Sequence, residues 1–144
     1  MGRLHEIRLR SEAFVRIMDL HIANSIKNVE PDLLKINKGQ LLKSKDALGK
    51  PLTNLKTGSQ YLSSAYARRK GKRTPNLYDT GQFQSEMFLE VDEKRWFIDS
   101  FDNKTKYLTE NYGNNIFGIS DKQRAKQLTG KSFKRLYERL VLAK

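Results

Sequence analysis

Residues 86–100 read EMFLEVDEKRWFIDS, and this stretch decides the fold class. Two runs rich in aromatic and aliphatic residues, Glu86 to Val91 and Arg95 to Ser100, are separated by three charged residues. Short β-prone runs joined by a few polar residues are typical of a β-hairpin. We therefore predict an antiparallel hairpin here. Its candidate core residues are Phe88, Val91, Trp96 and Ile98.

Upstream of the hairpin, the spacing of apolar residues predicts a helix from about Arg10. Its apolar positions recur at steps of three or four, which places them on one helical face. They are Val15, Met18, Ile22, Ile26 and Val29. Pro31 lacks a backbone N–H and restricts the residue before it, so the helix should end near Asn28 to Glu30.

Downstream of the hairpin, two further helices are expected. Thr105 to Asn111 should form the first, with Tyr107, Leu108 and Tyr112 facing inward and Gly113 ending it in left-handed backbone. The second is an amphipathic C-terminal helix, whose apolar positions are Phe133, Leu136, Tyr137, Leu140 and Val141. Together these elements predict one α+β domain over residues 1–144, with the N-terminal and C-terminal helices packed on a small antiparallel sheet.

Residues 31–75 should be irregular, because glycines and prolines are spaced along a polar, lysine-rich sequence. The spacing favours a short helix only around Tyr61 to Tyr66. A basic cluster follows in what should be an exposed, mobile loop that reaches beyond the domain. Its members are Arg68, Arg69, Lys70, Lys72 and Arg73. Three interpretations stay open: contact with a partner protein, contact with the phosphates of nucleic acid, or a solvated loop.

The charge of the 144-residue chain is unevenly distributed. The net charge is +12, yet residues 76–121 carry nine acidic and four basic side chains, while residues 41–75 carry nine basic and one acidic. Such polarity suits head-to-tail contacts between subunits, or contact with phosphate. The chain has no cysteine, so disulfides and thiolate metal sites are excluded. Neither a signal peptide nor a membrane span is recognisable, and we expect a soluble protein made in the cytoplasm.

No residue pattern predicts an active site. His5 and His21 have no second histidine or carboxylate at ligand spacing, so no metal or cofactor is expected. Asp32 with the distant run Asp92 to Lys94 formally resembles a magnesium nuclease, but that chemistry needs both carboxylates on adjacent core strands. Gly49-Lys50 lacks the upstream glycine of a phosphate-binding loop. We expect a protein without catalytic activity.

Several short motifs between Asn37 and Asp121 follow one another in an order that resembles a known family. They are Gln40-Leu41-Leu42, Asp46 to Leu52, Leu77 to Phe83 with Thr80, Gly81 and Phe83, Ile98-Asp99-Ser100, Lys106 to Leu108, Tyr112-Gly113, and Ile116 to Ser120 with Phe117 and Gly118. From local residue properties alone, Gly81 is interpreted as a turn glycine and Gly113 as the end of a helix. Gly118 is interpreted as a point of close backbone approach before Ser120, which can cap a helix. The order and spacing of the motifs resemble the virion morphogenesis or tail completion proteins of tailed phages, which include the Mu-like minor tail proteins.

This resemblance implies a structural virion protein at the tail or the head-to-tail junction, present in the host cytoplasm during assembly. It implies partners among other tail, neck or connector proteins, and self-association in a ring of six, with packaged DNA as a further contact. In that family the Thr80-Gly81 motif opens the hairpin. The alternative from the charge pattern is a basic nucleic-acid-binding protein.

Overall fold

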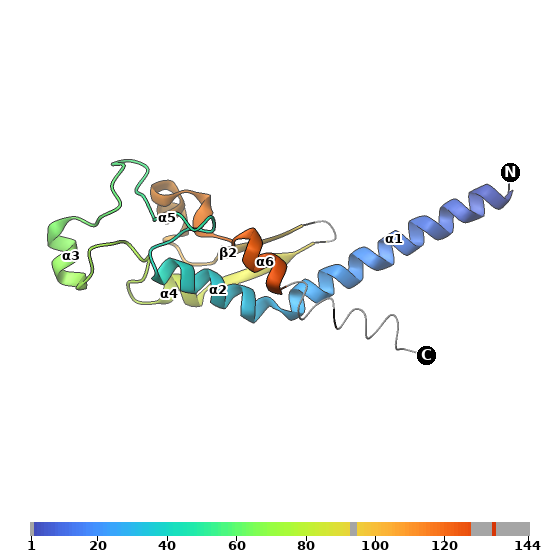
Figure 1. Ribbon diagram of the computed structural model, residues 1–144, viewed down its shortest axis with the longest axis horizontal. Coiled ribbons are helices and arrows are strands. Elements are labelled where there is room, and N and C mark those ends of the chain that lie inside the picture. The colour runs from blue at the N-terminus through green and yellow to red at the C-terminus, as the bar shows by residue number, and fades with distance from the viewer. Residues whose placement is uncertain (1, 93–94, 128–133, 135–144) are drawn as a thin grey trace.

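The computed structural model describes residues 2–92, 95–127 and 134, and it has an α+β fold (Figure 1). Its helices and strands are, in chain order, α1 (Gly2–Asn28), α2 (Glu30–Leu42), α3 (Ser64–Lys70), α4 (Gln82–Ser85), β1 (Met87–Val91), β2 (Trp96–Ser100), α5 (Thr105–Tyr112), the 3₁₀-helix η1 (Asn114–Ile116) and α6 (Asp121–Gln127). The predicted α+β class is confirmed. The predicted C-terminal helix around residues 133–141 lies outside the described residues, apart from Lys134.

The predicted hairpin is confirmed as an antiparallel pair of β1 and β2. Met87, Leu89 and Ile98 are buried, because alternate residues of each strand point to the same face. Val91 and Trp96 pack at the edge of this core as expected. Phe88 is a correction: it lies on the opposite face and stacks on Phe101, with 4.1 Å between ring centroids. Because β1 has apolar residues on both of its faces, the sequence did not determine which face points into the core.

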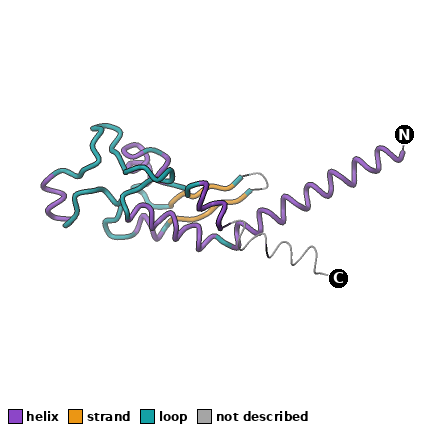
Figure 2. The backbone as a smooth tube through the Cα atoms, viewed as in Figure 1, coloured by secondary structure: helices purple, strands orange, loops and turns teal. Residues whose placement is uncertain are grey.

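Pro31 begins a helix rather than only ending one. The α1 helix ends at Asn28 as predicted, but α2 starts at once, with Pro31 in its first turn. The backbone N–H groups of a first turn have no partner within the helix, so a proline loses nothing there. Glu30 and Asp32 add negative charge where the helix dipole favours it. The irregular segment predicted from residue 31 therefore begins only after Leu42 (Figure 2).

The α2 helix forms the wall on which the hairpin lies. Leu33, Asn37 and Leu41 are fully buried and four residues apart, so they share one helical face. The Glu30 carboxylate accepts a hydrogen bond from the Leu89 N–H at 3.1 Å, which satisfies an edge group of β1. One hydrophobic cluster joins this face of α2 to the hairpin, the end of α1 and Ile116.

Most of α1 projects away from this core (Figure 1). It begins at Gly2, earlier than the predicted Arg10. Of the predicted apolar stripe, only Ile26 and Val29 reach the core, whereas Val15 is 56% exposed and Ile22 is 46% exposed. The α1 helix therefore contacts β1, as predicted, but most of its apolar stripe stays outside the core, because the two-stranded sheet is too short to cover a helix of this length.

The helix predicted after the hairpin is confirmed as α5, but its inward face is smaller than expected. Leu108 and Tyr112 pack against the core, whereas Tyr107 is 63% exposed. Gly113 has positive φ (82°) but an extended ψ of 169°, so it ends the helix without the left-handed geometry that we expected. Ser120 caps α6 as predicted, since its Oγ accepts from the Gln123 N–H at 3.4 Å.

Candidate functional site: a basic arm over a tyrosine-lined cleft

The basic cluster belongs to a helical arm, which we define as residues 63–73. Arg68, Arg69 and Lys70 form the last turn of α3, and Gly71 ends the helix with left-handed backbone. The prediction of a loop is wrong here, because alanine, arginine and lysine are good helix formers and cations are favourable at a helix C-terminus. Lys72 and Arg73 follow the helix. Figure 1 places the arm at the end of the molecule opposite the N-terminus of α1.

One hydrogen bond joins the arm to the body of the protein, and two more fix the backbone where the arm begins and ends. The Lys72 ammonium donates to the Leu42 carbonyl oxygen at 2.8 Å, and the Leu62 N–H donates to the Arg73 carbonyl oxygen at 2.8 Å. The Ser44 hydroxyl donates to Thr74 just beyond the arm. Arg68, Arg69 and Arg73 keep exposed side chains, while Lys70 and Lys72 are half-buried. The arm therefore presents three arginines to solvent from an anchored backbone.

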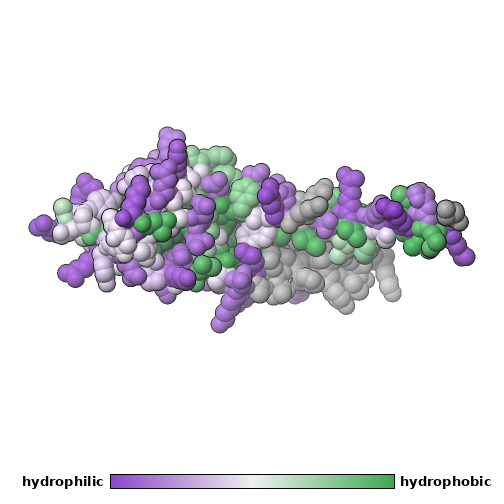
Figure 3. Space-filling model, turned by 90° about the horizontal axis from the view of Figure 1, so that it is seen from above, coloured by the Kyte–Doolittle hydropathy of each residue, from purple (hydrophilic) through white to green (hydrophobic). Residues whose placement is uncertain are grey.

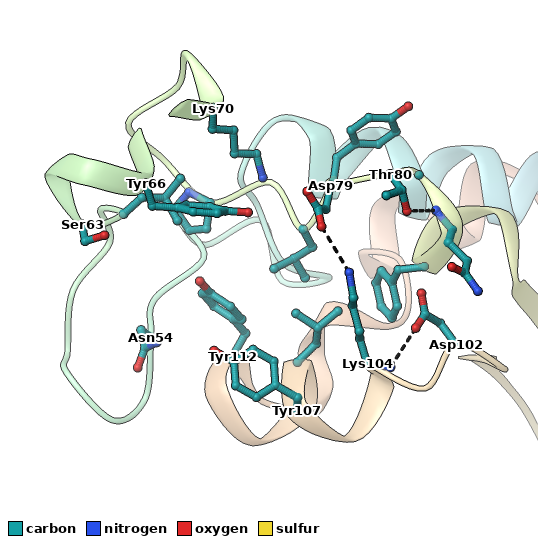
Figure 4. A pocket seen from close by; sticks show the side chains of 18 of the residues that line it. Asn54, Ser63, Tyr66, Lys70, Asp79, Thr80, Asp102, Lys104, Tyr107 and Tyr112 are labelled. Atoms are coloured by element: carbon teal, nitrogen blue, oxygen red, sulfur yellow. Dashed lines mark hydrogen bonds and ion pairs between the residues drawn. The ribbon is translucent and has the colours of Figure 1, made fainter. Parts of the chain in front are cut away.

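A cleft of about 740 Å³ separates the arm from α5 (Figure 4). Five tyrosines line it: Tyr61, Tyr66, Tyr78, Tyr107 and Tyr112. The rest of the wall mixes apolar and polar side chains, and it includes both positive charges, from Lys70 and Lys104, and negative charges, from Asp79 and Asp102. The structure thus gathers Lys70 of the basic cluster with Thr80, Gly81, Phe83 and Tyr112 of the predicted motifs in one cleft.

Burial changes the acid–base properties of two cleft residues. Desolvation lowers the pKa of Lys70, with a further decrease from Lys72 that opposes an increase caused by Asp79. Burial raises the pKa of Tyr112, and the neighbouring Tyr107 and Tyr66 raise it further. Asp79 instead pairs with Lys104, with 3.2 Å between Nζ and Oδ2. The cleft consequently has aromatic walls and a lysine that lacks an anionic partner at ion-pair distance among the described residues.

The Thr80-Gly81-Phe83 motif shapes one wall of this cleft. Gly81 has φ of 87°, and a Cβ at this position would approach the Tyr78 hydroxyl oxygen to 3.0 Å. The turn interpretation is confirmed, although the short helix α4 separates this turn from β1. Phe83 is buried, and its ring centroid lies 5.8 Å from that of Phe117. These motif residues are therefore structural supports of the cleft.

Asn37 was missed as a key residue by sequence reasoning. Its Nδ2 donates to the Ile116 carbonyl oxygen at 2.9 Å, and its Oδ1 accepts from the Gly118 N–H at 3.2 Å. Gly118 passes close to Ala47, where an added Cβ would lie 3.4 Å from the alanine Cβ. The available signal was a lone asparagine placed midway between Leu33 and Leu41 on an apolar helical face.

The described residues do not form the catalytic or metal-binding arrangements considered above. Asp32 lies on α2 and Asp92 follows β1, where it accepts a hydrogen bond from the Arg95 N–H at 2.8 Å, so the two are not on adjacent core strands. Over residues 2–92 and 95–127, no group of three histidine or acidic side chains is placed to hold a metal ion. His5 and His21 both lie on α1.

Comparisons with protein-family models, curated proteins and solved structures find no match to this chain. Within the described part, no helix has the length and apolar character needed to cross a membrane. The projecting α1 helix and the basic arm with its cleft lie at opposite ends of the molecule (Figure 1).

Proposed function

We propose that this chain is a structural virion protein of a tailed bacteriophage, acting at the tail or the head-to-tail junction in tail completion and assembly, without a catalytic role. The ordered motifs from Asn37 to Asp121 support the family, and the projecting α1 helix carries the assembly role.

Large apolar side chains are exposed along α1 to a degree that a helix in water does not favour. They are Leu4, Ile7, Leu9, Phe14, Val15, Ile17, Leu20 and Ile22, each between 46% and 75% exposed. Figure 3 shows green, hydrophobic surface between purple, hydrophilic surface along the projecting part of the molecule. Exposed apolar side chains that cluster along a helix mark a protein contact, and a helix gains most of its stability from such packing. This helix is therefore built for assembly with other protein surfaces.

The basic arm lies at the other end and supplies a second contact. Its exposed arginines can pair with carboxylates of a neighbouring ring, since arginine suits planar, bidentate recognition. One protein with an apolar contact at one end and a basic contact at the other is suited to join two different structures. Acidic partner proteins of the tail, neck or connector are the partners that we propose for the arm.

A second candidate function is a free basic nucleic-acid-binding protein. The observation that favours it is the juxtaposition of three exposed arginines with tyrosine side chains, because arginines contact phosphates and aromatic rings stack on unpaired bases. In the virion, the same groups would contact packaged DNA.

Localising the chain tests the proposal against this alternative. Imaging of intact particles, together with co-purification through mature virions and isolated tails, should find the protein at the tail or neck. A protein that is absent from virions and recovered bound to DNA in the host cytoplasm would reject the structural role and favour the alternative.

Removing the arm charges should separate assembly from folding. We expect the variant with glutamine at Arg68, Arg69, Lys70, Lys72 and Arg73 to fold, losing roughly 1 kcal/mol through the Lys72 contact, but to lower the yield of infectious particles in a deletion complementation assay. A control with glutamine at five exposed lysines elsewhere removes the same charge; these are Lys35, Lys43, Lys50, Lys106 and Lys122. If both variants complement fully, the arm makes no functional contact.

A further inference from the structure

The α1 helix carries two apolar stripes rather than one. The first stripe continues toward the core at Ile26 and Val29, and its outer members are Leu4, Ile7, Phe14, Val15, Met18 and Ile22. The second stripe consists of Leu9, Ala13, Ile17 and Leu20. At about 100° per residue, the two stripes lie on roughly opposite sides of the helix. Both are exposed: Val15 is 56% exposed on the first stripe, and Ile17 is 52% exposed on the second.

Charged residues separate the two stripes along both edges of the helix. Arg8 pairs with Glu12 at 2.8 Å on one edge, and Arg10 pairs with Glu6 at 3.1 Å toward the other. One flat partner surface could cover one stripe only, because these charged edges would stop it from reaching the second. Two protein surfaces on opposite sides of α1 are needed to cover both.

We infer that α1 packs between the α1 helices of two neighbouring copies of this chain, with its first stripe against the second stripe of the next copy. The inference rests on the proposed assembly function and names the partner of its apolar helix. A symmetric contact between two identical stripes would leave the other stripe of each copy exposed. A contact between unlike stripes repeats from copy to copy, buries both stripes, and closes when the rotation between copies completes a ring.

The side chains of the two stripes are complementary in size and in flanking charge. The first stripe projects Phe14, whereas the second has the small Ala13 at almost the same height along the helix. When parallel copies pack in this way, Asp19 beside the first stripe faces Arg16 beside the second stripe of the next copy. On the other edge, Arg10 faces the neighbour's Glu6. Opposite charges thus meet at both edges, as in the interhelical pairs that set partner orientation in coiled coils.

A matched pair of variants of the full chain tests this arrangement. Val15→Glu disables the first stripe and Ile17→Glu disables the second, with nearly equal exposure at the two positions and the same change in charge. Sedimentation equilibrium should show the unmodified protein associating with rising concentration and each variant weakened by about 30-fold or more. An equimolar mixture of the two variants should form a dimer and stop there, because one intact pair of unlike stripes remains.

Three results would overturn the inference: a monomeric unmodified protein at every concentration, an Ile17→Glu variant that associates like the unmodified protein, or a mixture that shows no association. Circular dichroism checks that each variant keeps its helix content, and Phe14→Glu with Leu20→Glu repeats the design at independent positions. If the purified protein stays monomeric but is found at the tail or neck of virions, the proposed function stands and only this inference fails.

Discussion

Replacing Asn37 with alanine should destabilise the protein markedly, because this one side chain joins α2 to the segment around Gly118. The side chain is completely buried, and it makes one hydrogen bond to the Ile116 carbonyl oxygen and one to the Gly118 N–H. Alanine removes both bonds and leaves both backbone groups in the core without their partner.

The expected loss follows from the cost of unsatisfied buried groups. Each buried donor or acceptor left without a partner costs about 1–3 kcal/mol. Relaxation of the 116–118 segment toward water recovers part of that cost, so we expect the free energy of unfolding to fall by about 2–4 kcal/mol. That is a large fraction of the roughly 5–15 kcal/mol that stabilises a typical domain.

Urea denaturation followed by circular dichroism measures this loss as a shift of the unfolding midpoint at unchanged slope. Asn103→Ala is the control, because Asn103 is exposed and the same atoms are removed; we expect a change within about 0.5 kcal/mol. A loss below about 1 kcal/mol for Asn37→Ala would refute the reasoning, since it would mean that the two backbone groups are satisfied without the asparagine.

Two other predictions concern the cleft. Gly81→Ala should destabilise the protein by about 1–2 kcal/mol, because residue 81 has left-handed backbone and the new Cβ would lie 3.0 Å from the Tyr78 hydroxyl oxygen. Gly39→Ala should instead stabilise the protein by up to about 1 kcal/mol, because Gly39 lies within α2 with open space around it. Thermal unfolding compares the two, and equal effects would contradict the assigned strain. The raised pKa of Tyr112 means that the unfolded chain loses this proton first, so stability should fall as pH rises above about 10, and it should fall more than in Tyr112→Phe. The lowered pKa of Lys70 changes stability with pH in the opposite direction, but this effect is the same in the unmodified protein and in Tyr112→Phe. Parallel curves of melting temperature against pH for the two proteins would contradict the Tyr112 assignment.

The sequence predicted correctly those elements that are specified by residues close to one another in the chain. The hairpin from residues 87 to 100, the end of α1 at Asn28, α5 and the cap at Ser120 all follow from signals within a few residues. The helix α2 was not predicted, because Pro31 was interpreted only as the end of the preceding helix. A proline also fits the first turn of a new helix, and the neighbouring residues do not distinguish the two roles. The basic cluster was assigned to a loop because its high charge suggested exposure to solvent, although alanine, arginine and lysine are also good helix formers.

What the sequence determined by itself is the α+β class, the hairpin, and the uneven placement of positive charge. Only the tertiary structure decided which apolar residues are buried. Val15 and Ile26 share one helical stripe, yet Ile26 is buried near the short two-stranded sheet, whereas Val15 stays exposed. The same holds for the cleft, where Lys70, Gly81 and Tyr112 meet although many residues separate them. Periodicity shows which faces can pack, but the length and position of the partner surface decide which of them do.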